Sequence, residues 1–434
     1  MNRLGVLLAS ALFALIPAAG SAEAQEPQVA RHVLPNGLTV LVRENPAVGV
    51  VAVSLQVRAG SRFETEATAG ITNFLHRAML RGTARRTAVQ LATSSEDIGG
   101  SLDANGEVEA AEVRGQALAR HWETLLALVA EVGLLPALRP DEIEKERRLL
   151  LAQIKTRADA PFSFSFDAVL RELYGTSPYG RSQLGSKESI ERTTRDDLLA
   201  HYRAIYQPDR MVLAVSGQVE RKRVIKAAER LFGKMVRSGA DAQGTLAVSE
   251  PSGERRVITR PAQQAQILVA YLGPGLSDPL YPAVRVLAAA LGGGMAGRLF
   301  VELRDRRGLA YSTAVLTPYR TGPIFFVAYL GTAPASAAAA EAGVLRELER
   351  VREAPVNGDE LARAKAYVRG QLAMDRRTNA RMAWYMAFFE TVGAGWDFPD
   401  RYARALDAVT AEDVARAAGR YLTRPSIVVL QPGR

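Results

Sequence analysis

The chain has 434 residues, of which 48% are hydrophobic and 23% charged, and its formal net charge is +9. This length exceeds one ordinary domain, so size alone predicts two domains. The chain contains no cysteine, which excludes disulfides, thiol catalysis and thiolate zinc sites. Its arginines are spread evenly, without a run of like charge or a basic stripe interleaved with aromatic residues, so we expect no nucleic-acid partner.

The first residues have the pattern of an export signal. Arg3 supplies a positive charge, residues 4–16 form an apolar segment, and Ala22-Glu-Ala24 is a suitable cleavage site. No later stretch is apolar enough to cross a membrane. The sequence therefore predicts a signal peptide at residues 1–24 and, for a bacterial source, a mature chain that is periplasmic or secreted and not membrane-bound.

The first half of the mature chain mixes predicted strands and helices without strict alternation, which indicates the α+β class. The Asn36-Gly37 pair between two apolar runs predicts a hairpin. Hydrophobic periodicity predicts strands at residues 32–42 (two), 50–57, 108–114 and 211–216, and helices at residues 70–83, 88–97, 122–134, 141–157, 164–174 and 195–205.

A segment rich in Gly and small polar residues, 236–255, is predicted to be a linker, and the pattern then begins again. Asp141-Glu-Ile with Gln153 is repeated 218 residues later as Asp359-Glu-Leu with Gln371. A period this long indicates a domain duplication. The predicted fold is α+β with two homologous domains, residues 25–235 and 256–434, each a mostly antiparallel sheet packed by helices.

Residues 70–83 carry the motif around which the first half is organised. Asn73, His76 and Arg77 are predicted to share the polar face of this helix. A zinc hydrolase can use such a face for two His ligands and a general-base Glu in the order H-x-x-E-H. Arginine cannot bind a cation and Asn is a poor zinc ligand, so the frame of a metal helix is present without its metal chemistry. A lone histidine such as His76 is expected at a surface or an interface.

Motifs in the same order along nearly the whole mature chain resemble the pitrilysin/insulinase-type zinc peptidases. That resemblance implies a clam-shell half, a zinc site and a third ligand, a Glu, on a later helix, where this chain has Gln153. The two His ligands, the base and the Glu ligand are thus replaced by Asn73, Arg77, His76 and Gln153. The first-half motifs are Leu34-Pro-Asn-Gly-Leu38, Gly60-Ser-Arg-Phe-Glu64, Gly82-Thr83, Tyr174-Gly-Thr-Ser-Pro-Tyr-Gly180 and Gly185.

The second half keeps a further motif of the same family, Leu291-Gly-Gly-Gly-Met-Ala-Gly-Arg-Leu-Phe with Arg304 and Gly308-Leu-Ala-Tyr311. The resemblance implies that Arg304 and Tyr311 contact the peptide backbone and the developing oxyanion. Arg offers fixed planar donors and a phenol donates one hydrogen bond, which suits this chemistry. The alternative is that Arg304 pairs with Glu302 or Asp305 and that Tyr311 merely packs.

The combination predicts a non-catalytic subunit of a heterodimeric periplasmic zinc metallopeptidase, inactive alone. Its expected partners are a homologous H-x-x-E-H subunit, which carries the zinc, and a peptide substrate. This chain itself is expected to hold no metal or other cofactor. Two alternatives remain: an inactive structural, assembly or peptide-binding protein of the same fold, and a stand-alone metallopeptidase with an unusual ligand set.

Overall fold

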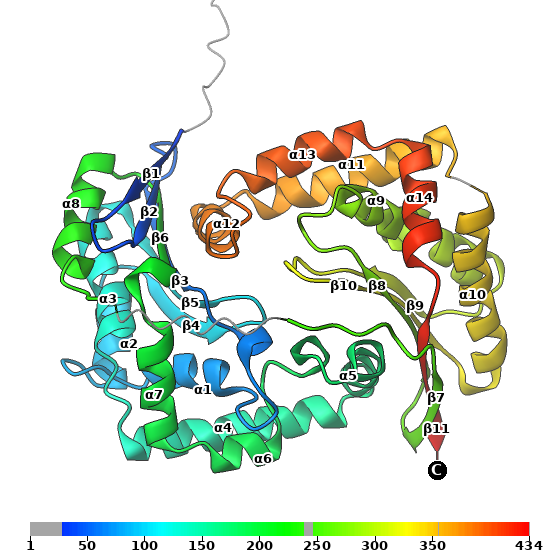
Figure 1. Cartoon of the computed structure of the whole chain (residues 1–434), viewed down its shortest axis with the longest axis horizontal. Coiled ribbons are helices and arrows are strands. Elements are labelled where there is room, and N and C mark those ends of the chain that lie inside the picture. Colours follow the sequence, from blue (N-terminus) through cyan, green and yellow to red (C-terminus); the bar gives the residue numbers. More distant parts are fainter. Residues whose placement is uncertain (1–27, 238–245, 355, 434) are drawn as a thin grey trace, which may run out of the picture.

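The computed structural model describes residues 28–237, 246–354 and 356–433, which form two sheets covered by helices (Figure 1). The predicted signal peptide, residues 1–24, and much of the predicted linker lie outside the described residues. Within them, no helix has the length and apolar character that a membrane span requires.

The first sheet has the strand order β1-β2-β6-β3-β5-β4, and its neighbours are antiparallel except for the pair β2 and β6. Strands β3 and β6 are central and almost wholly buried, as strands covered on both faces must be. The strands are β1 (Val29–Val33), β2 (Thr39–Glu44), β3 (Val50–Val57), β4 (Ser101–Gly106), β5 (Ala111–Leu118) and β6 (Met211–Gly217).

Eight α-helices belong to the described part of the first half. They are α1 (Ile71–Met79), α2 (Ala88–Glu96), α3 (Trp122–Leu134), α4 (Pro140–Asp159), α5 (Pro161–Tyr174), α6 (Lys187–Arg192), α7 (Arg195–Ile205) and α8 (Arg221–Phe232).

The second sheet has the order β7-β11-β8-β10-β9 and is antiparallel except for β7 and β11. Its strands are β7 (Arg255–Pro261), β8 (Ala265–Gly273), β9 (Ser312–Leu316), β10 (Ile324–Thr332) and β11 (Ser426–Gly433). Its α-helices are α9 (Tyr281–Gly292), α10 (Ala337–Glu353), α11 (Gly358–Asp375), α12 (Asn379–Thr391), α13 (Phe398–Ala408) and α14 (Ala411–Tyr421).

The two halves repeat one another in detail, as the sequence predicts. Helices α7 and α14 each have 11 residues and each follow a threonine N-cap, Thr194 or Thr410. In both, the threonine side chain accepts from the backbone of an aspartate three residues on, and that carboxylate accepts from the threonine N–H at 2.8 or 2.9 Å. This reciprocal capping fixes both helix starts. The predicted α+β fold with two mostly antiparallel sheets is confirmed.

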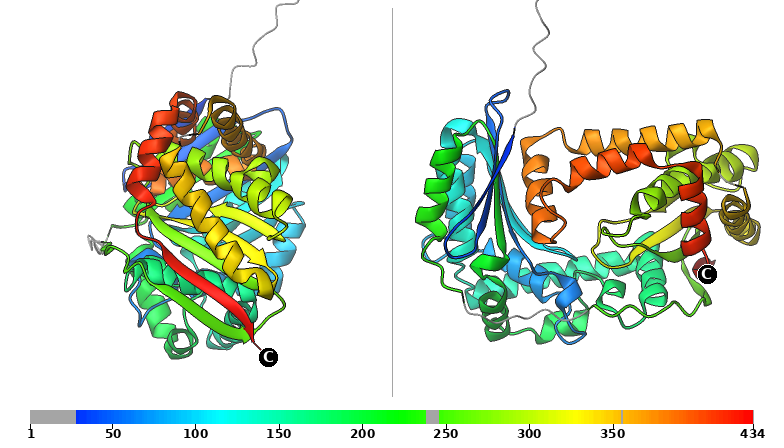
Figure 2. Two further views of the ribbon diagram at one scale, coloured as in Figure 1. Left: turned by 90° about the vertical axis from the view of Figure 1, so that its right-hand side faces the viewer. Right: turned by 45° about the horizontal axis from the view of Figure 1, so that its top comes forward.

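One helix of each half packs on the sheet of the other half. Helix α5, from the first half, packs on β8 and β11, and α12, from the second half, packs on β3 and β6. Figure 1 shows α12 beside the first sheet and α5 beneath the second, and Figure 2 shows the same arrangement from other sides. Two apolar clusters cross between the halves, one joining Val169 and Leu173 to Leu268, the other joining Ala214 to Met386. The halves defined by the sequence repeat are therefore not separate packing units.

Candidate functional site

Helix α1, which carries the altered metal motif, is held at its N-terminus by Glu64. This carboxylate accepts from the backbone N–H of Gly70 at 2.7 Å and of Thr72 at 2.9 Å, groups that a helix start leaves without partners. Burial raises the pKa of Glu64, and these hydrogen bonds act in the opposite direction. Gly70 has a φ of 85°, and a Cβ there would lie 2.7 Å from the Cα of Gly185. Three residues of the sequence motifs therefore position α1.

Asn73, at the first predicted ligand position, is buried against β4. Its Nδ2 donates to the carbonyl oxygen of Gly106 at 3.1 Å. Within the described ranges, its Oδ1 is buried without a hydrogen-bond partner. A Cβ at Gly106 would lie 2.7 Å from the backbone nitrogen of Asn73, so this close contact requires glycine. Asn73 thus ties α1 to the edge of the first sheet.

His76 does not lie at a surface or an interface; that expectation was wrong. Its side chain is fully buried, its Nδ1 lies 2.8 Å from the carbonyl oxygen of Thr72, and its Nε2 lies 3.0 Å from the hydroxyl of Tyr206. Since a carbonyl can only accept, Nδ1 carries the proton and Nε2 accepts from Tyr206. Burial lowers the pKa of His76 to about 4. The ring is neutral and has no lone pair left for a metal ion.

Arg77 and Gln153 do come together, as the motif register predicts. The Arg77 Nη1 donates to Oε1 of Gln153 at 2.6 Å, and its Nε donates to Oε1 of Glu146 at 2.5 Å. Arg81 donates to the other oxygen of Glu146 at 2.6 Å. Glu146 is buried, with 2% of its surface exposed. A guanidinium therefore joins α1 to α4 where the motif places two metal ligands.

The sequence motif did not reveal the role of Glu146. Its charged neighbours on α4 are typical of an ion-paired helix face, and Glu144 pairs with Arg147 on the same helix. Glu146 instead faces α1, because it lies seven residues, or two helical turns, before Gln153 and so shares its face. That spacing was the signal that could have identified it.

The residues at the motif positions on α1 and α4 are not suited to bind a zinc ion. Zinc requires lone pairs from imidazole, thiolate or carboxylate groups, whereas Arg77 brings a positive charge and both ring nitrogens of His76 are engaged. In the part of the chain that the structure describes, no group of three or more His, Asp or Glu side chains is placed to hold a metal ion. The site is an ion-pair cluster between two helices.

Arg304 lies in an exposed part of a π-helical turn in the second half, and Tyr311 lies directly before β9. This turn, Phe300–Arg306, comes shortly before β9. The guanidinium of Arg304 lies 4.8 Å from the ring centre of Phe300. Glu302 pairs with Arg306 at 2.6 Å, and no described carboxylate pairs with Arg304.

Tyr311 is 59% exposed. Its backbone N–H donates to the carbonyl oxygen of Gly331 at 2.9 Å, which anchors the residue beside β10. The alternative in which Arg304 pairs with Glu302 and Tyr311 packs is therefore not observed. Both residues are exposed, and among the described residues no hydrogen bond joins their side chains.

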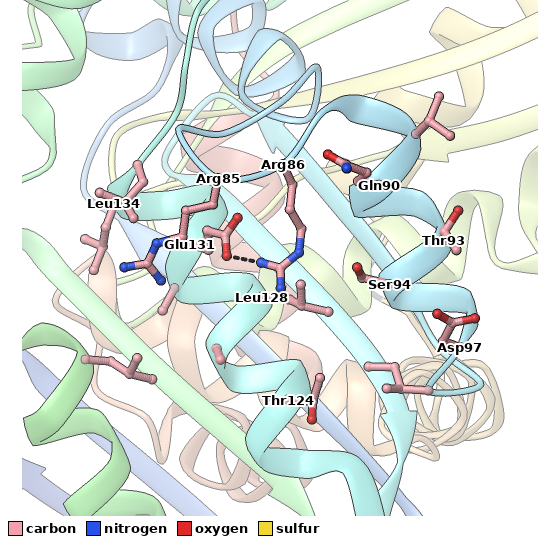
Figure 3. A pocket seen from close by; sticks show the side chains of 16 residues that line it. Arg85, Arg86, Gln90, Thr93, Ser94, Asp97, Thr124, Leu128, Glu131 and Leu134 are labelled. Atoms are coloured by element: carbon pink, nitrogen blue, oxygen red, sulfur yellow. Dashed lines mark hydrogen bonds and ion pairs between the residues drawn. The ribbon is translucent and has the colours of Figure 1, made fainter.

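A separate pocket of about 930 Å³ lies between α2 and α3 (Figure 3). Arg86 reaches across it and forms an ion pair with Glu131, while Gln90, Thr93 and Ser94 line the α2 side. Among the described residues that line this pocket there is none of the predicted site residues. We therefore do not place the site there.

Comparison with known proteins supports the family. Residues 39–187 match the model of "Insulinase (Peptidase family M16)", and residues 192–368 match that of "Peptidase M16 inactive domain". An uncharacterized zinc protease of Mycobacterium leprae is 35% identical over 301 residues, which cover 68% of each chain. An uncharacterized zinc protease of Rickettsia bellii is 27% identical over 390 residues, which cover 89% of this chain and 93% of the relative.

Solved structures share the fold. A protease from Helicobacter pylori superimposes with a TM-score of 0.87 at 21% identity, covering 94% of this chain and all of the other. A peptidase M16 inactive domain from Pseudomonas fluorescens gives a TM-score of 0.85 at 22% identity, covering 94% and 99%. With the sequence matches, these findings establish that the chain belongs to the peptidase M16 (insulinase) family.

Proposed function

We propose that this peptidase homologue is the non-catalytic subunit of a heterodimeric zinc metallopeptidase. The observation that carries the proposal is the cation at the metal position: Arg77 bridges Glu146 and Gln153 where the family motif would hold zinc. A second cation in the same place would meet direct charge repulsion. The zinc therefore belongs to the partner, a homologous H-x-x-E-H subunit.

Within that complex, Arg304 and Tyr311 would bind the peptide. Both residues are exposed, which suits residues that contact a peptide bound between this chain and its partner. Arg304 would hold the backbone carbonyl with its planar donors, and Tyr311 would donate to the oxyanion as it forms. The export pattern at residues 1–24 supports a periplasmic site of action.

Two other functions compete with this one. A purely structural or assembly role would leave Arg304 and Tyr311 without a task, and their exposed, unpaired donors favour a binding role. A stand-alone metallopeptidase would need zinc ligands, and the side chains at Asn73, His76, Arg77 and Gln153 are engaged in contacts within the protein.

The test uses the chain mixed with an H-x-x-E-H subunit from the same source. In the mixture, Arg304→Ala and Tyr311→Phe should each lower kcat/KM by about a hundred-fold, the scale of losing one oxyanion donor. Arg306→Ala is the matched control, since Arg306 sits on the same turn but pairs with Glu302. Turnover by the Arg304 and Tyr311 variants equal to that of the control would contradict their role.

A further inference from the structure

A second cavity, of about 480 Å³, lies in the second half and is lined by residues of α9, β9 and α11 and by Tyr385 of α12. Glycines 292 and 293, from the motif before Arg304, line it. A Cβ at Gly292 would lie 2.5 Å from the backbone nitrogen of Val315, so the close approach of α9 to β9 depends on glycine there. The cavity is therefore built by motif residues that have no part in the proposed function.

The cavity contains an arginine whose charge is not neutralised by the protein. Arg285 projects from α9, and its guanidinium lies 4.9 Å from the ring centre of Tyr319. Its Nη1 donates to the carbonyl oxygen of Thr317 at 3.1 Å and lies 3.5 Å from the hydroxyl of Tyr281. Over the described ranges, no carboxylate lies within ion-pair distance of it, and its polar partners are a backbone carbonyl and the hydroxyls of Tyr281 and Tyr402. Because a guanidinium has five N–H donors, donors remain for a ligand.

The other ionisable groups of the cavity cannot balance that charge. Asp375 is already paired with Arg381, at 3.0 Å between Oδ1 and Nε, and it also accepts from the hydroxyl of Tyr385 at 2.6 Å. Burial raises the pKa of Tyr281 and of Tyr385 well above the usual tyrosine value, so both phenols stay neutral at physiological pH. Among the described residues, none supplies an anion that neutralises Arg285.

The mouth of the cavity adds a second cation and apolar surface. Arg377 is exposed there, and its Nε donates to the carbonyl oxygen of Met374 at 2.8 Å. Tyr367 is 42% exposed and Met374 is 55% exposed, so both offer apolar surface to a ligand. A ligand with a carboxylate next to an apolar group would suit both the arginines and the apolar surface.

The sequence repeat relates this cavity to the altered metal site. Gln371, at the cavity wall, is the repeat counterpart of Gln153, which accepts from Arg77. In the first half, the arginine beside this glutamine is neutralised by Glu146. In the second half, the arginine of the cavity comes from α9, and no described carboxylate forms an ion pair with it. Arg285 and Gln371 line the same cavity, whereas Arg77 and Gln153 are joined by a hydrogen bond.

We propose that this cavity binds a carboxylate of a peptide, with Arg285 and Arg377 as its partners and Tyr367 and Met374 against the neighbouring apolar residue. The proposal rests on the proposed function only in taking the ligand to be a peptide. The same chemistry can come from a C-terminal carboxylate or from an acidic side chain, and the experiment separates these sources.

The test measures binding of fluorescent peptides to the purified chain without any partner subunit, so failure of the heterodimer would not affect it. One peptide ends in Leu with a free carboxylate, a second is its C-terminal amide, and a third is the amide with an internal Glu beside Leu. We expect a carboxylate peptide to bind about tenfold or more tightly than the neutral amide, the scale of a charge-assisted hydrogen bond. The peptide that gains affinity identifies the source, and equal binding of all three would overturn the proposal.

Variants then locate the site. Arg285→Met should weaken binding of the preferred peptide about tenfold or more, and Arg346→Met, an exposed arginine on α10 that does not line the cavity, is the matched control. Because Arg285 is partly buried, Arg377→Ala at the exposed mouth serves as a second variant and should also weaken binding. Unchanged affinity in Arg377→Ala, or in Arg285→Met with an intact fold by circular dichroism, would overturn the proposal.

Discussion

Arg77 on α1 donates to Gln153 on α4 at 2.6 Å, and with this bond a guanidinium lies where the family motif places metal ligands. The same guanidinium pairs with the buried Glu146. A fixed organic cation thus joins the two helices that a zinc ion would otherwise join. At these motif positions, an ion pair and a hydrogen bond connect the two helices.

The stability of this cluster can be measured directly. Arg77→Leu leaves Glu146 buried with Arg81 as its remaining partner, so we expect a loss of about 2 kcal/mol in the free energy of unfolding, less than the cost of leaving a buried charge wholly unpaired. Arg148→Leu, an exposed position on α4, is the matched control. Denaturant unfolding followed by circular dichroism gives both values. Equal stabilities would show that the cluster does not hold α1 to α4.

The buried histidine predicts acid sensitivity. Burial lowers the pKa of His76 to about 4 from 6.5, so between pH 6.5 and 4 the unfolded state binds a proton that the folded state does not. Stability should therefore fall as the pH decreases through this window, by about 3 kcal/mol for this group at pH 4.

Unfolding at several pH values tests that prediction. His76→Gln should flatten the pH dependence, whatever its effect at pH 7. Burial also lowers the pKa of His201 to about 4, so His201→Gln should flatten it similarly and the double variant about twice as much. A wild-type slope retained in the double variant would contradict this assignment.

The contact between the two halves includes a buried carboxylate. Glu109 is 3% exposed and accepts from Arg62 at 2.6 Å and from Thr321 of the second half at 2.9 Å; the hydroxyl of Tyr179 also donates to it. Glu109→Ala should destabilise the chain by about 3 kcal/mol and speed amide exchange at residues 317–323. Glu66→Ala, at an exposed position, should do neither. Unchanged exchange in the Glu109 variant would show that this carboxylate does not connect the halves.

If only side chains are missing from the metal site, restoring them should restore zinc binding. The variant Asn73→His, Arg77→His and Gln153→Glu returns two His ligands to one face of α1 and a Glu ligand to α4. We expect about one zinc per chain after dialysis, measured by plasma mass spectrometry, and none in the single Asn73→His control. A folded triple variant without zinc would show that the helices no longer have the spacing of a metal site.

Some elements could be predicted closely from sequence. Residues 50–57, 122–134 and 195–205 match β3, α3 and α7 because a continuous apolar run, regular periodicity or a clear N-cap marks their ends. Neither strand β4 nor helix α8 is predicted from the sequence, since β4 (Ser-Leu-Asp-Ala-Asn-Gly) lacks strand formers and half of the residues of α8 are charged. The exchange of α5 and α12 could not be predicted, because an apolar helix face does not specify which sheet it covers.

The site could be predicted only where the sequence can be aligned with the zinc-site motif of the family. That alignment predicted that Arg77 and Gln153 lie close together, and the structure confirms the contact. It said nothing of the environment of His76, whose burial depends on Tyr206, a residue 130 positions away. The lack of a carboxylate partner at Arg285 could likewise not be predicted from sequence, because it depends on how the described residues pack.

The central claim is that this chain assists hydrolysis at a metal held by another chain, and reconstitution tests it most directly. Zinc content and peptide turnover would be measured for the chain alone, for the H-x-x-E-H subunit alone and for their equimolar mixture. We predict no stoichiometric zinc and no turnover for the chain alone, and for the mixture a turnover well above that of the partner by itself. Stoichiometric zinc with peptide cleavage by the isolated chain would contradict the account.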